Sequence, residues 1–437
     1  MIATLSKTRN PWPPDSALPR GPAAALAALH LGEPRMDGLV RLNDREWRQA
    51  LDFCGRSQIT LALRRRACHA MPGWVREVTD RNLAHNLERL CRLQELYRFL
   101  SARLAAEGIE FLALKGLTHC PEFGAEPQDR PQYDVDVYIP RETIIAARDA
   151  LLATGFEIQE GLEAFPTDHL PALIRKTGWQ WRGDVFDPEM PLAIELHFQF
   201  WNGATERLDA PGVEEFWRRR ITRRVAGIEL AALCAPDSLG YAALHVLRHI
   251  LQGSGRPFHV FEVASFLESH AGDRAFWTDW RAVHSPELRR LQAVAFRLAS
   301  AWFGCELAPA AREEVEQLPS ATQAWFDEFA LSPARRLFQS NKDELWLHLS
   351  LLASRRDAFL VARRRLFPGR LPPPVDAIHI PRSQMRWHRR VLKGLRWSAY
   401  SASRLIHHAA ALPGAVSSGA RWWWKINRLG GNARHDT

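Results

Sequence analysis

The chain has 437 residues, of which 46% are hydrophobic and 24% are charged, a balance typical of folded proteins and not of disordered or collagen-like ones. This length predicts two or three packed units and excludes a mini-protein. The sequence contains neither the roughly 18 uninterrupted apolar residues of a transmembrane helix nor the apolar run of a secretion signal near its start, so we expect a cytoplasmic protein.

The charge and the cysteines narrow the function classes further. The net charge of +9 belongs to the end of the chain, because residues 382–437 hold eleven Lys or Arg and one Asp, whereas the rest holds 47 bases and 48 acids. A near-neutral body without a recognition module makes a purely nucleic-acid-binding protein a weaker interpretation. The six cysteines form no C-x-x-C pair, which indicates buried thiols and neither a zinc knuckle nor a disulfide framework.

The N-terminal part of the chain is expected to be helical after a short arm. Residues 1–22 hold five prolines and no periodic apolar pattern, which predicts a flexible arm. Over residues 23–108 the pattern is helical, and leucines with one tyrosine recur at three- and four-residue steps between Leu83 and Leu104. This stripe predicts the packing face of a long helix that ends at Gly108.

The middle of the chain, residues 109–230, changes to a period of two. Strand-like runs occur at 109–116, 133–139 and 193–200, and a helical segment is expected near 141–154. This alternation of strands and helix predicts an α/β unit.

Helical periodicity returns over residues 231–367. The proline-rich segment 368–375 then predicts a stiff linker into a basic, tryptophan-rich tail that ends at residue 437. The expected fold class is therefore α+β, with a small mixed sheet flanked by N-terminal and C-terminal helical regions.

Two strands of the middle unit carry acids on one face. In the run 133–139, Asp134 and Asp136 point to the same side, and their Cα atoms lie about 6.6 Å apart, the length of two strand rises. Glu195 stands on the polar side of the run 193–200. If these strands are neighbours, three carboxylates meet and repel one another unless a cation binds between them. A divalent metal site is the simplest prediction.

The strand before this acidic pair ends in Lys115 and Gly116, and a helix-like segment follows. A glycine at a strand-to-helix turn lets backbone N–H groups approach a phosphate, and a helix N-terminus adds positive potential. The turn therefore predicts a phosphate-binding seat.

The order of these motifs resembles a known family. The sequence holds L-K-G at 114–116, a loop Arg at Arg130, D-x-D at 134–136, T-G-F at 154–156 and I-E-L-H at 194–197. This order is similar to that of the uncharacterised nucleotidyltransferase family of the DNA polymerase beta superfamily.

The resemblance implies a fold, a reaction and roles for individual residues. The sheet would be of the polymerase-beta type, Asp134 and Asp136 would match the metal-binding pair, Glu195 the third acid and Gly116 the phosphate turn. Two Mg²⁺ ions would assist transfer of a nucleoside monophosphate from an NTP to an unknown acceptor. Lys115 and Arg130 would contact phosphate, although a strand-end Lys and a loop Arg are as often ordinary surface residues.

The sequence departs from the family pattern at the glycine turn, where Gly116-Leu117-Thr118 replaces the usual Gly-Ser. This departure keeps open a second hypothesis from another class. On that hypothesis the protein is a non-catalytic adaptor that keeps the fold and acts through its helical regions and its tail within a biosynthetic complex.

Three histidines are candidates for contact with the substrate. His197 shares the acidic face of its strand, but a structural histidine fits the pattern equally well. His245 and His249 have the i, i+4 spacing of a metal pair, yet the sequence shows no third ligand and no H-E-x-x-H motif. Helix packing is the default interpretation of these two, and contact with the substrate is the alternative.

The tail at residues 382–437 combines its basic charge with five tryptophans. Tryptophan beside Lys and Arg is typical of segments that bind the headgroup boundary of an anionic membrane. Peripheral membrane contact is thus one interpretation of the tail. Binding to nucleic acid is another. The third is a disordered appendage, or a helix that docks on the protein body with its tryptophans buried.

Overall fold

The chain is described by a computed structural model in which most residues are placed. The described residues are 11–12, 18–159, 168–368 and 387–432. Nearly all of the linker expected at 368–375 lies outside them.

The first described residues are more ordered than the predicted arm. Trp12 is buried, and its indole N–H donates a hydrogen bond to the carbonyl of Trp302 at 2.8 Å. Helix α1 (Arg20–Leu29) begins before residue 22. The arm prediction was therefore wrong for these positions, because apolar contacts with the helical body hold them.

A seven-stranded mixed sheet lies at the centre of the middle unit, in the order β3-β4-β5-β2-β1-β7-β6. Its strands are β1 (Leu112–Ala113), β2 (Asp134–Tyr138), β3 (Glu157–Ile158), β4 (Leu173–Ile174), β5 (Ala193–His197), β6 (Ile221–Val225) and β7 (Ile228–Ala232). The β2–β5 and β1–β7 pairs are parallel and the remaining pairs are antiparallel. With helices on both sides in sequence, this confirms the α+β fold class.

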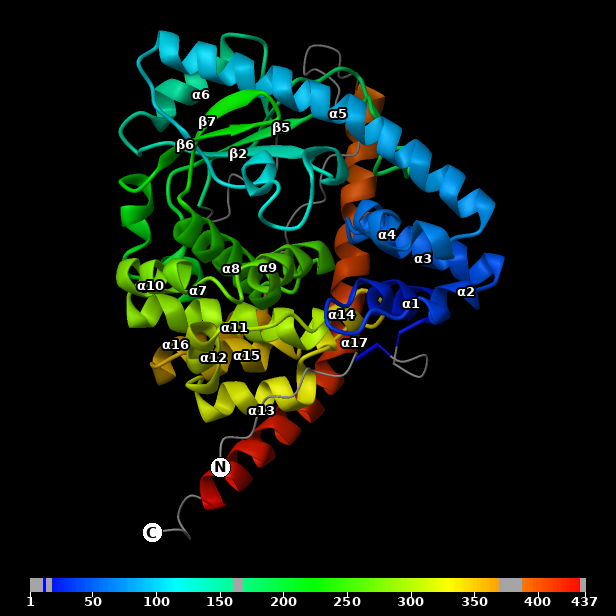
Figure 1. Cartoon of the computed structure of the whole chain (residues 1–437), viewed down its shortest axis with the longest axis vertical. Coiled ribbons are helices and arrows are strands. Elements are labelled where there is room, and N and C mark those ends of the chain that lie inside the picture. The colour runs from blue at the N-terminus through cyan, green and yellow to red at the C-terminus, as the bar shows by residue number, and fades with distance from the viewer. Residues whose placement is uncertain (1–10, 13–17, 160–167, 369–386, 433–437) are drawn as a thin grey trace.

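Helices form the rest of the described chain (Figure 1). Before and within the sheet unit they are α1, α2 (Asp37–Val40), α3 (Asp44–Arg56), α4 (Thr60–Ala67), α5 (Gly73–Ala106), α6 (Ile144–Leu152) and α7 (Gly203–Glu206). After it they are α8 (Ala235–Leu251), α9 (Pro257–Ser269), α10 (Arg274–Val283), α11 (Pro286–Phe303), α12 (Pro309–Glu316), α13 (Ser320–Phe329), α14 (Ser332–Arg335), α15 (Glu344–Leu351), α16 (Arg355–Leu366) and α17 (Trp387–Asn432). Short 3₁₀ turns occur at Cys68–Ala70, Gly116–His119, Pro127–Asp129 and Val213–Trp217.

The long helix α5 crosses over the sheet (Figure 1). Its C-terminal half behaves as the leucine stripe predicts, since Leu93, Tyr97 and Leu104 are buried in one core with the strands. Its N-terminal half differs, because Leu87 is exposed and Arg89 is buried instead. This half faces loop carbonyl groups, to which the Arg89 guanidinium donates, and not the apolar face of the sheet.

The cysteines are only partly as predicted. All six are free, but Cys68 and Cys91 are exposed instead of buried. Both stand on the solvent side of helical segments, and Cys91 is not one of the residues that form the Leu83–Leu104 stripe of α5.

Helix α17 is the tail of the chain, and in Figure 1 it runs from the level of α5 to beyond α13. Its C-terminal half docks on the helical body, where Trp422 donates to the carbonyl of Ala321 at 2.9 Å and Trp346 donates to Ser418 at 3.0 Å. Along much of its length the helix also exposes large apolar side chains. Within the described residues, no helix has the length and apolar character needed to cross a membrane.

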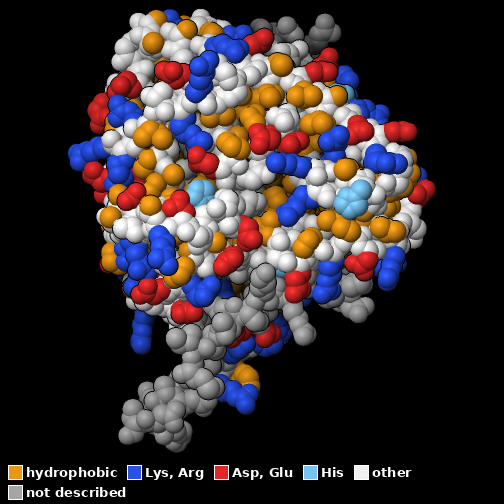
Figure 2. All heavy atoms as spheres, viewed as in Figure 1, with side chains coloured by type: hydrophobic (Ala, Val, Ile, Leu, Met, Phe, Trp, Pro, Cys, Tyr) orange, Lys and Arg blue, Asp and Glu red, His pale blue; other side chains and the backbone are white. Residues whose placement is uncertain are grey.

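The surface of the body carries both signs of charge. Figure 2 shows basic and acidic side chains interspersed over the viewed face, with small apolar areas between them. This mixture agrees with the near-neutral charge of the sequence outside the tail.

Candidate functional site

A large cavity of about 780 Å³ opens between the sheet and the helices α8 and α9. Ligand pockets in proteins commonly have volumes of roughly 300 to 1,000 Å³. Most of the residues singled out in the sequence line this cavity, namely Lys115, Gly116, Arg130, Asp134, Glu195, His245 and His249.

Three acids lie on adjacent parallel strands beside this cavity. Asp136 of β2 is paired in register with Glu195 of β5, and Asp134 lies two residues earlier on the same face of β2. Oxygens of Asp136 and Glu195 and a nitrogen of His197 all lie within 4.8 Å of one another. The Asp136 side chain is only 1% exposed, whereas that of Glu195 is 27% exposed. We refer to Asp134, Asp136 and Glu195 as the acid cluster. Asp136 is at its buried end.

Two cationic side chains contact the acid cluster. The ammonium of Lys115 lies 3.2 Å from Oδ2 of Asp136. The ring Nε2 of His197 lies 3.2 Å from Oδ1 of Asp136 and 3.7 Å from Oε2 of Glu195. These two positive groups thus offset part of the negative charge of the three acids.

The pKa values follow from burial and from these contacts. Burial alone lowers the pKa of His197, but three carboxylates outweigh it and raise that pKa well above its usual value; they are Asp136, Asp168 and Glu195. Burial raises the pKa of Glu195, yet the contact with His197 holds it at about 2. For Asp134, burial and then repulsion from Asp136 raise the pKa.

Gly116 packs closely against Gln132, and no α-helix follows the turn. Gly116 has a φ of +78°, and a Cβ atom there would lie 2.3 Å from Nε2 of Gln132. That amide nitrogen donates to the carbonyl of Asp134 at 2.7 Å. The helix expected after Gly116 is a single 3₁₀ turn (Gly116–His119). Such a turn presents backbone N–H groups without the dipole of a longer helix.

Arg130 is buried, so it is not the ordinary surface residue that was one of its two expected interpretations. Its guanidinium forms two hydrogen bonds with the buried Glu262 of α9, at 2.8 and 3.2 Å. His119 lies 3.4 Å from the same carboxylate. Burial raises the pKa of Glu262, but Arg130 outweighs burial and holds it at about 2. The charge of Arg130 is therefore largely neutralised by a structural ion pair, although its side chain still lines the cavity.

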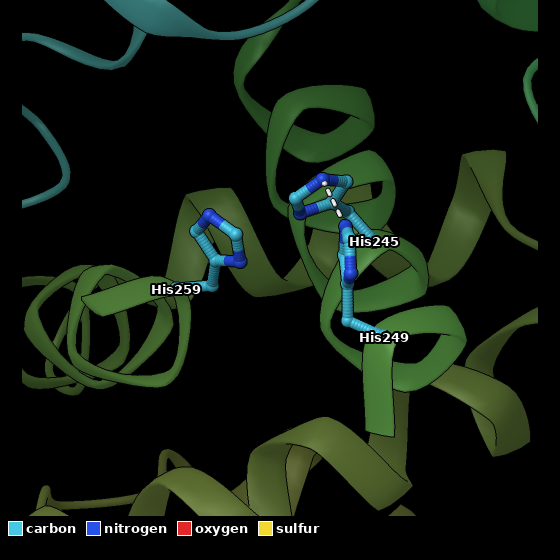
Figure 3. A group of neighbouring side chains, drawn as sticks. All are labelled: His245, His249 and His259. Atoms are coloured by element: carbon cyan, nitrogen blue, oxygen red, sulfur yellow. Dashed lines mark hydrogen bonds between the residues drawn. The ribbon is translucent and has the colours of Figure 1, made fainter. Parts of the chain in front are cut away.

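His245 and His249 of α8 meet a third histidine, His259 of α9, on the helical side of the cavity (Figure 3). Nitrogens of His245 and His249 lie 3.0 Å apart, and Nζ of Lys115 lies 3.4 Å from His245. Burial, followed by nearby positive charges, lowers the pKa of all three rings well below the usual value. We refer to these three residues as the histidine cluster.

Sequence reasoning missed four residues of this region: Asp168, Arg248, Arg256 and His259. Asp168 lies 3.6 Å from Nδ1 of His197 and forms an ion pair with Arg248 of α8. Arg256 is exposed and lines the cavity. No motif marks Asp168, Arg256 or His259. Arg248 lies one helical turn after His245, so the period of α8 was the one available signal.

Comparisons with known proteins give one informative match. No curated protein matched the chain significantly. A solved structure of an antigenic nucleotidyltransferase-like protein from Paracoccidioides brasiliensis is 16% identical, and the match covers 50% of this chain and 95% of that chain with a TM-score of 0.26.

The family model described as "Uncharacterised nucleotidyltransferase" matches residues 43–304. This range is more than half of the chain and runs from the start of α3 to the end of α11, so it includes the sheet, the acid cluster and the histidine cluster. The chain therefore belongs to the uncharacterised nucleotidyltransferase family.

Proposed function

We propose that the protein transfers a nucleoside monophosphate from an NTP to an acceptor, with two Mg²⁺ ions at the acid cluster. One observation carries this proposal: the parallel register of β2 and β5 pairs Asp136 with Glu195 and leaves Asp134 on the same face beside a large cavity. Three carboxylates at such spacing suit hard divalent cations, which bind oxygen ligands.

The residues of the acid cluster fit a cation. Oδ2 of Asp136 is buried and has no hydrogen-bond partner among the described residues, since Lys115 lies near it without hydrogen-bond geometry. Asp134, Asp136 and Glu195 would hold the ions, and His197 would orient Asp136 and Glu195. Bound Mg²⁺ would supply charge stabilisation at the reacting phosphate and lower the pKa of the acceptor oxygen.

Other groups of the chain would bind the nucleotide. The ammonium of Lys115 and the exposed guanidinium of Arg256 both lie at the cavity, where they would contact phosphate oxygens. The backbone N–H groups after Gly116 would add neutral donors. Arg130 would act indirectly, since its pair with Glu262 ties the loop before β2 to α9.

The adaptor hypothesis has one observation in its favour. Lys115 and His197 already balance the charge of Asp136, as they would in a protein that never binds a metal. Nucleotide binding separates the two hypotheses. Calorimetry with Mg²⁺ and each NTP should show binding to the wild type and none to Asp134→Ala, whereas an adaptor would bind no NTP in either form.

The acceptor can be sought in the same preparation. A panel of NTPs labelled at the α-phosphate, followed by mass spectrometry of the labelled product, would identify both the nucleotide and the acceptor class. Labelled product that forms equally with Asp134→Ala would contradict the proposal.

We also propose that α17 contacts an anionic membrane surface. At about 100° per residue, nine of its ten exposed large apolar side chains fall within an arc of about 140°. They are Trp387, Val391, Leu392, Leu395, Leu405, Ile406, Val416, Trp423 and Trp424. Buried residues of the docked half, such as Ala415 and Ser418, lie on the opposite face. An apolar stripe on a basic helix is typical of interfacial binding.

Vesicle sedimentation at low salt tests this second proposal. The full-length protein should pellet with anionic vesicles, and Leu405→Glu should reduce the bound fraction because it places an acid in the stripe. Trp397→Glu is the matched control, since Trp397 is equally on α17 and exposed but lies outside the arc. Equal binding of both variants, or equal binding to neutral vesicles, would overturn the membrane proposal.

A further inference from the structure

The three imidazole rings of the histidine cluster lie close together between α8 and α9 (Figure 3). All three residues line the cavity. The ring centroids of His245 and His249 lie 4.4 Å apart, those of His245 and His259 lie 4.5 Å apart, and those of His249 and His259 lie 5.4 Å apart. One nitrogen from each ring lies within 4.8 Å of the others. The rings therefore converge and do not simply stack in a helix interface.

These distances suit a single metal ion. With metal–nitrogen bonds of about 2.1 Å and tetrahedral angles, ligand nitrogens lie about 3.4 Å apart. The observed separation of 3.0 Å between the nitrogens of His245 and His249 is close to this value, and a nitrogen of His259 lies within 4.8 Å of both. Two histidines at i and i+4 on one helix, joined by a third from a neighbouring helix, give three ligands with an open fourth position.

The surroundings also orient the rings for ligation. Nδ1 of His249 lies 2.9 Å from Oγ of Ser254, a contact that directs Nε2 toward the cluster. Nδ1 of His259 is buried and has no hydrogen-bond partner among the described residues. A buried ring nitrogen without a partner is costly unless something else binds there.

We propose that His245, His249 and His259 form a second metal site, which binds a transition-metal ion of the Zn²⁺ or Co²⁺ class and leaves one coordination position open to the cavity. Imidazole nitrogens favour these ions, whereas Mg²⁺ requires oxygen ligands. The two walls of the cavity would thus select different metals. This inference does not depend on nucleotidyl transfer.

Lys115 is the group that opposes a cation at this site. Its ammonium lies 3.4 Å from Nε2 of His245 and 3.2 Å from Asp136. When a metal takes the His245 nitrogen, Lys115 retains its acidic partner and loses only the weaker contact. The lysine would then lie between the two metal sites and would moderate the affinity of the second.

Titration of the full-length protein with Co²⁺ in excess Mg²⁺ tests the proposal, because the visible absorption of four-coordinate Co²⁺ reports the site without any enzyme assay. The wild type should bind about one equivalent, displaceable by Zn²⁺, in line with a three-histidine site. His249→Ala and His259→Ala should each lose the absorption. Ser254→Ala should weaken binding roughly tenfold through the loss of ring orientation. Lys115→Met should bind more tightly, because a neighbouring positive charge is removed.

Two controls separate this proposal from the proposed function. His407→Ala removes an exposed histidine of α17 far from the cluster in sequence and should leave Co²⁺ binding unchanged. Asp136→Asn should also keep the absorption while it loses nucleotidyl transfer. Circular dichroism would verify that each variant folds. Absence of a Co²⁺ site in the wild type, or a site that persists in a folded His259→Ala variant, would overturn the proposal.

Discussion

The two walls of the cavity are built in different ways. On the sheet side, the acid cluster follows from strand alternation and the parallel register of β2 and β5. On the helical side, the histidine cluster depends on how α8 packs against α9. The first arrangement leaves a local pattern in the sequence, and the second leaves only the pair His245 and His249. Functional residues on paired strands are therefore easier to predict from a sequence than functional residues that come together where two helices pack.

The largest expected effect on activity comes from a substitution in the acid cluster. Asp136→Asn should reduce nucleotidyl transfer on the order of 10³-fold or more, because it removes a charged ligand at the buried end of the cluster. Repulsion among the three carboxylates would by itself make the metal-free variant more stable than the wild type. Since Lys115 and His197 contact Asp136, we expect the metal-free variant to be less stable. Labelled-NTP assays and thermal unfolding measure the two effects.

Asp149→Asn is the matched control for this substitution, since Asp149 is an exposed aspartate on α6. Its activity and melting temperature should equal those of the wild type. Full activity in Asp136→Asn would contradict the proposal that the acid cluster binds the catalytic metal ions.

The next effect tests how rigidly the helical wall is attached to the sheet. Glu262→Gln should destabilise the protein at pH 7 by about 3 kcal/mol, because it leaves the buried Arg130 without its counter-charge. The pKa of Glu262 is about 2 in the folded protein, below its unfolded value of about 4.3. Its contribution is therefore present above about pH 4.3 and is lost as the pH falls toward 2.

Denaturant unfolding at several pH values measures this difference. The gap between wild type and Glu262→Gln should be widest near neutrality and should narrow below about pH 4. A difference in the free energy of unfolding that is constant with pH would show that the charge of Glu262 does not stabilise the protein.

Glu195→Gln should cost less than either aspartate substitution. Glu195 is more exposed than Asp136, and glutamine retains an oxygen ligand, so we expect a loss of roughly 10- to 100-fold in transfer. Steady-state assays over a range of Mg²⁺ concentrations measure it, and excess Mg²⁺ should recover part of the activity. A loss equal to that of Asp136→Asn would mean that the two acids share one role.

The smallest effect concerns Arg256, at the start of α9. Arg256→Ala should raise the KM for the NTP several-fold with little change in kcat, because an exposed guanidinium contributes binding and not chemistry. Arg56→Ala is the control, since Arg56 also lines the cavity but is paired with Asp52 at 2.6 Å. Equal effects of both substitutions would indicate a general electrostatic contribution instead of a phosphate contact.

The acidic half of the site could be predicted because alternation places Asp134 and Asp136 together without knowledge of the rest of the fold. The position of Arg130 could not, since its partner Glu262 lies 132 residues away in the sequence. His259 was missed for the same reason. The helix after Gly116 was predicted too long because Pro121, which has no N–H, follows directly after the 3₁₀ turn and Cys120.

In the tail, the length of the helix is the feature that the sequence did not predict. The composition of the tail left open membrane contact, nucleic-acid binding, and a disordered appendage or docked helix, and the structure shows a helix of 46 residues that continues through Pro413. Proline usually ends a helix, so this continuity was not evident from the sequence. Packing of the following turns on α13 supplies contacts that hold the helix beyond that residue.

The contact between Gly116 and Gln132 has a consequence for how related sequences vary. A Cβ atom at position 116 would collide with the Gln132 amide that holds the carbonyl of Asp134. A larger residue at 116 is therefore compatible only with a smaller one at 132. Such a pair would lack the hydrogen bond from Gln132 to the carbonyl of Asp134 on the acidic strand. We expect the two positions to change together among homologues, with glycine and glutamine retained jointly wherever the acidic pair is retained.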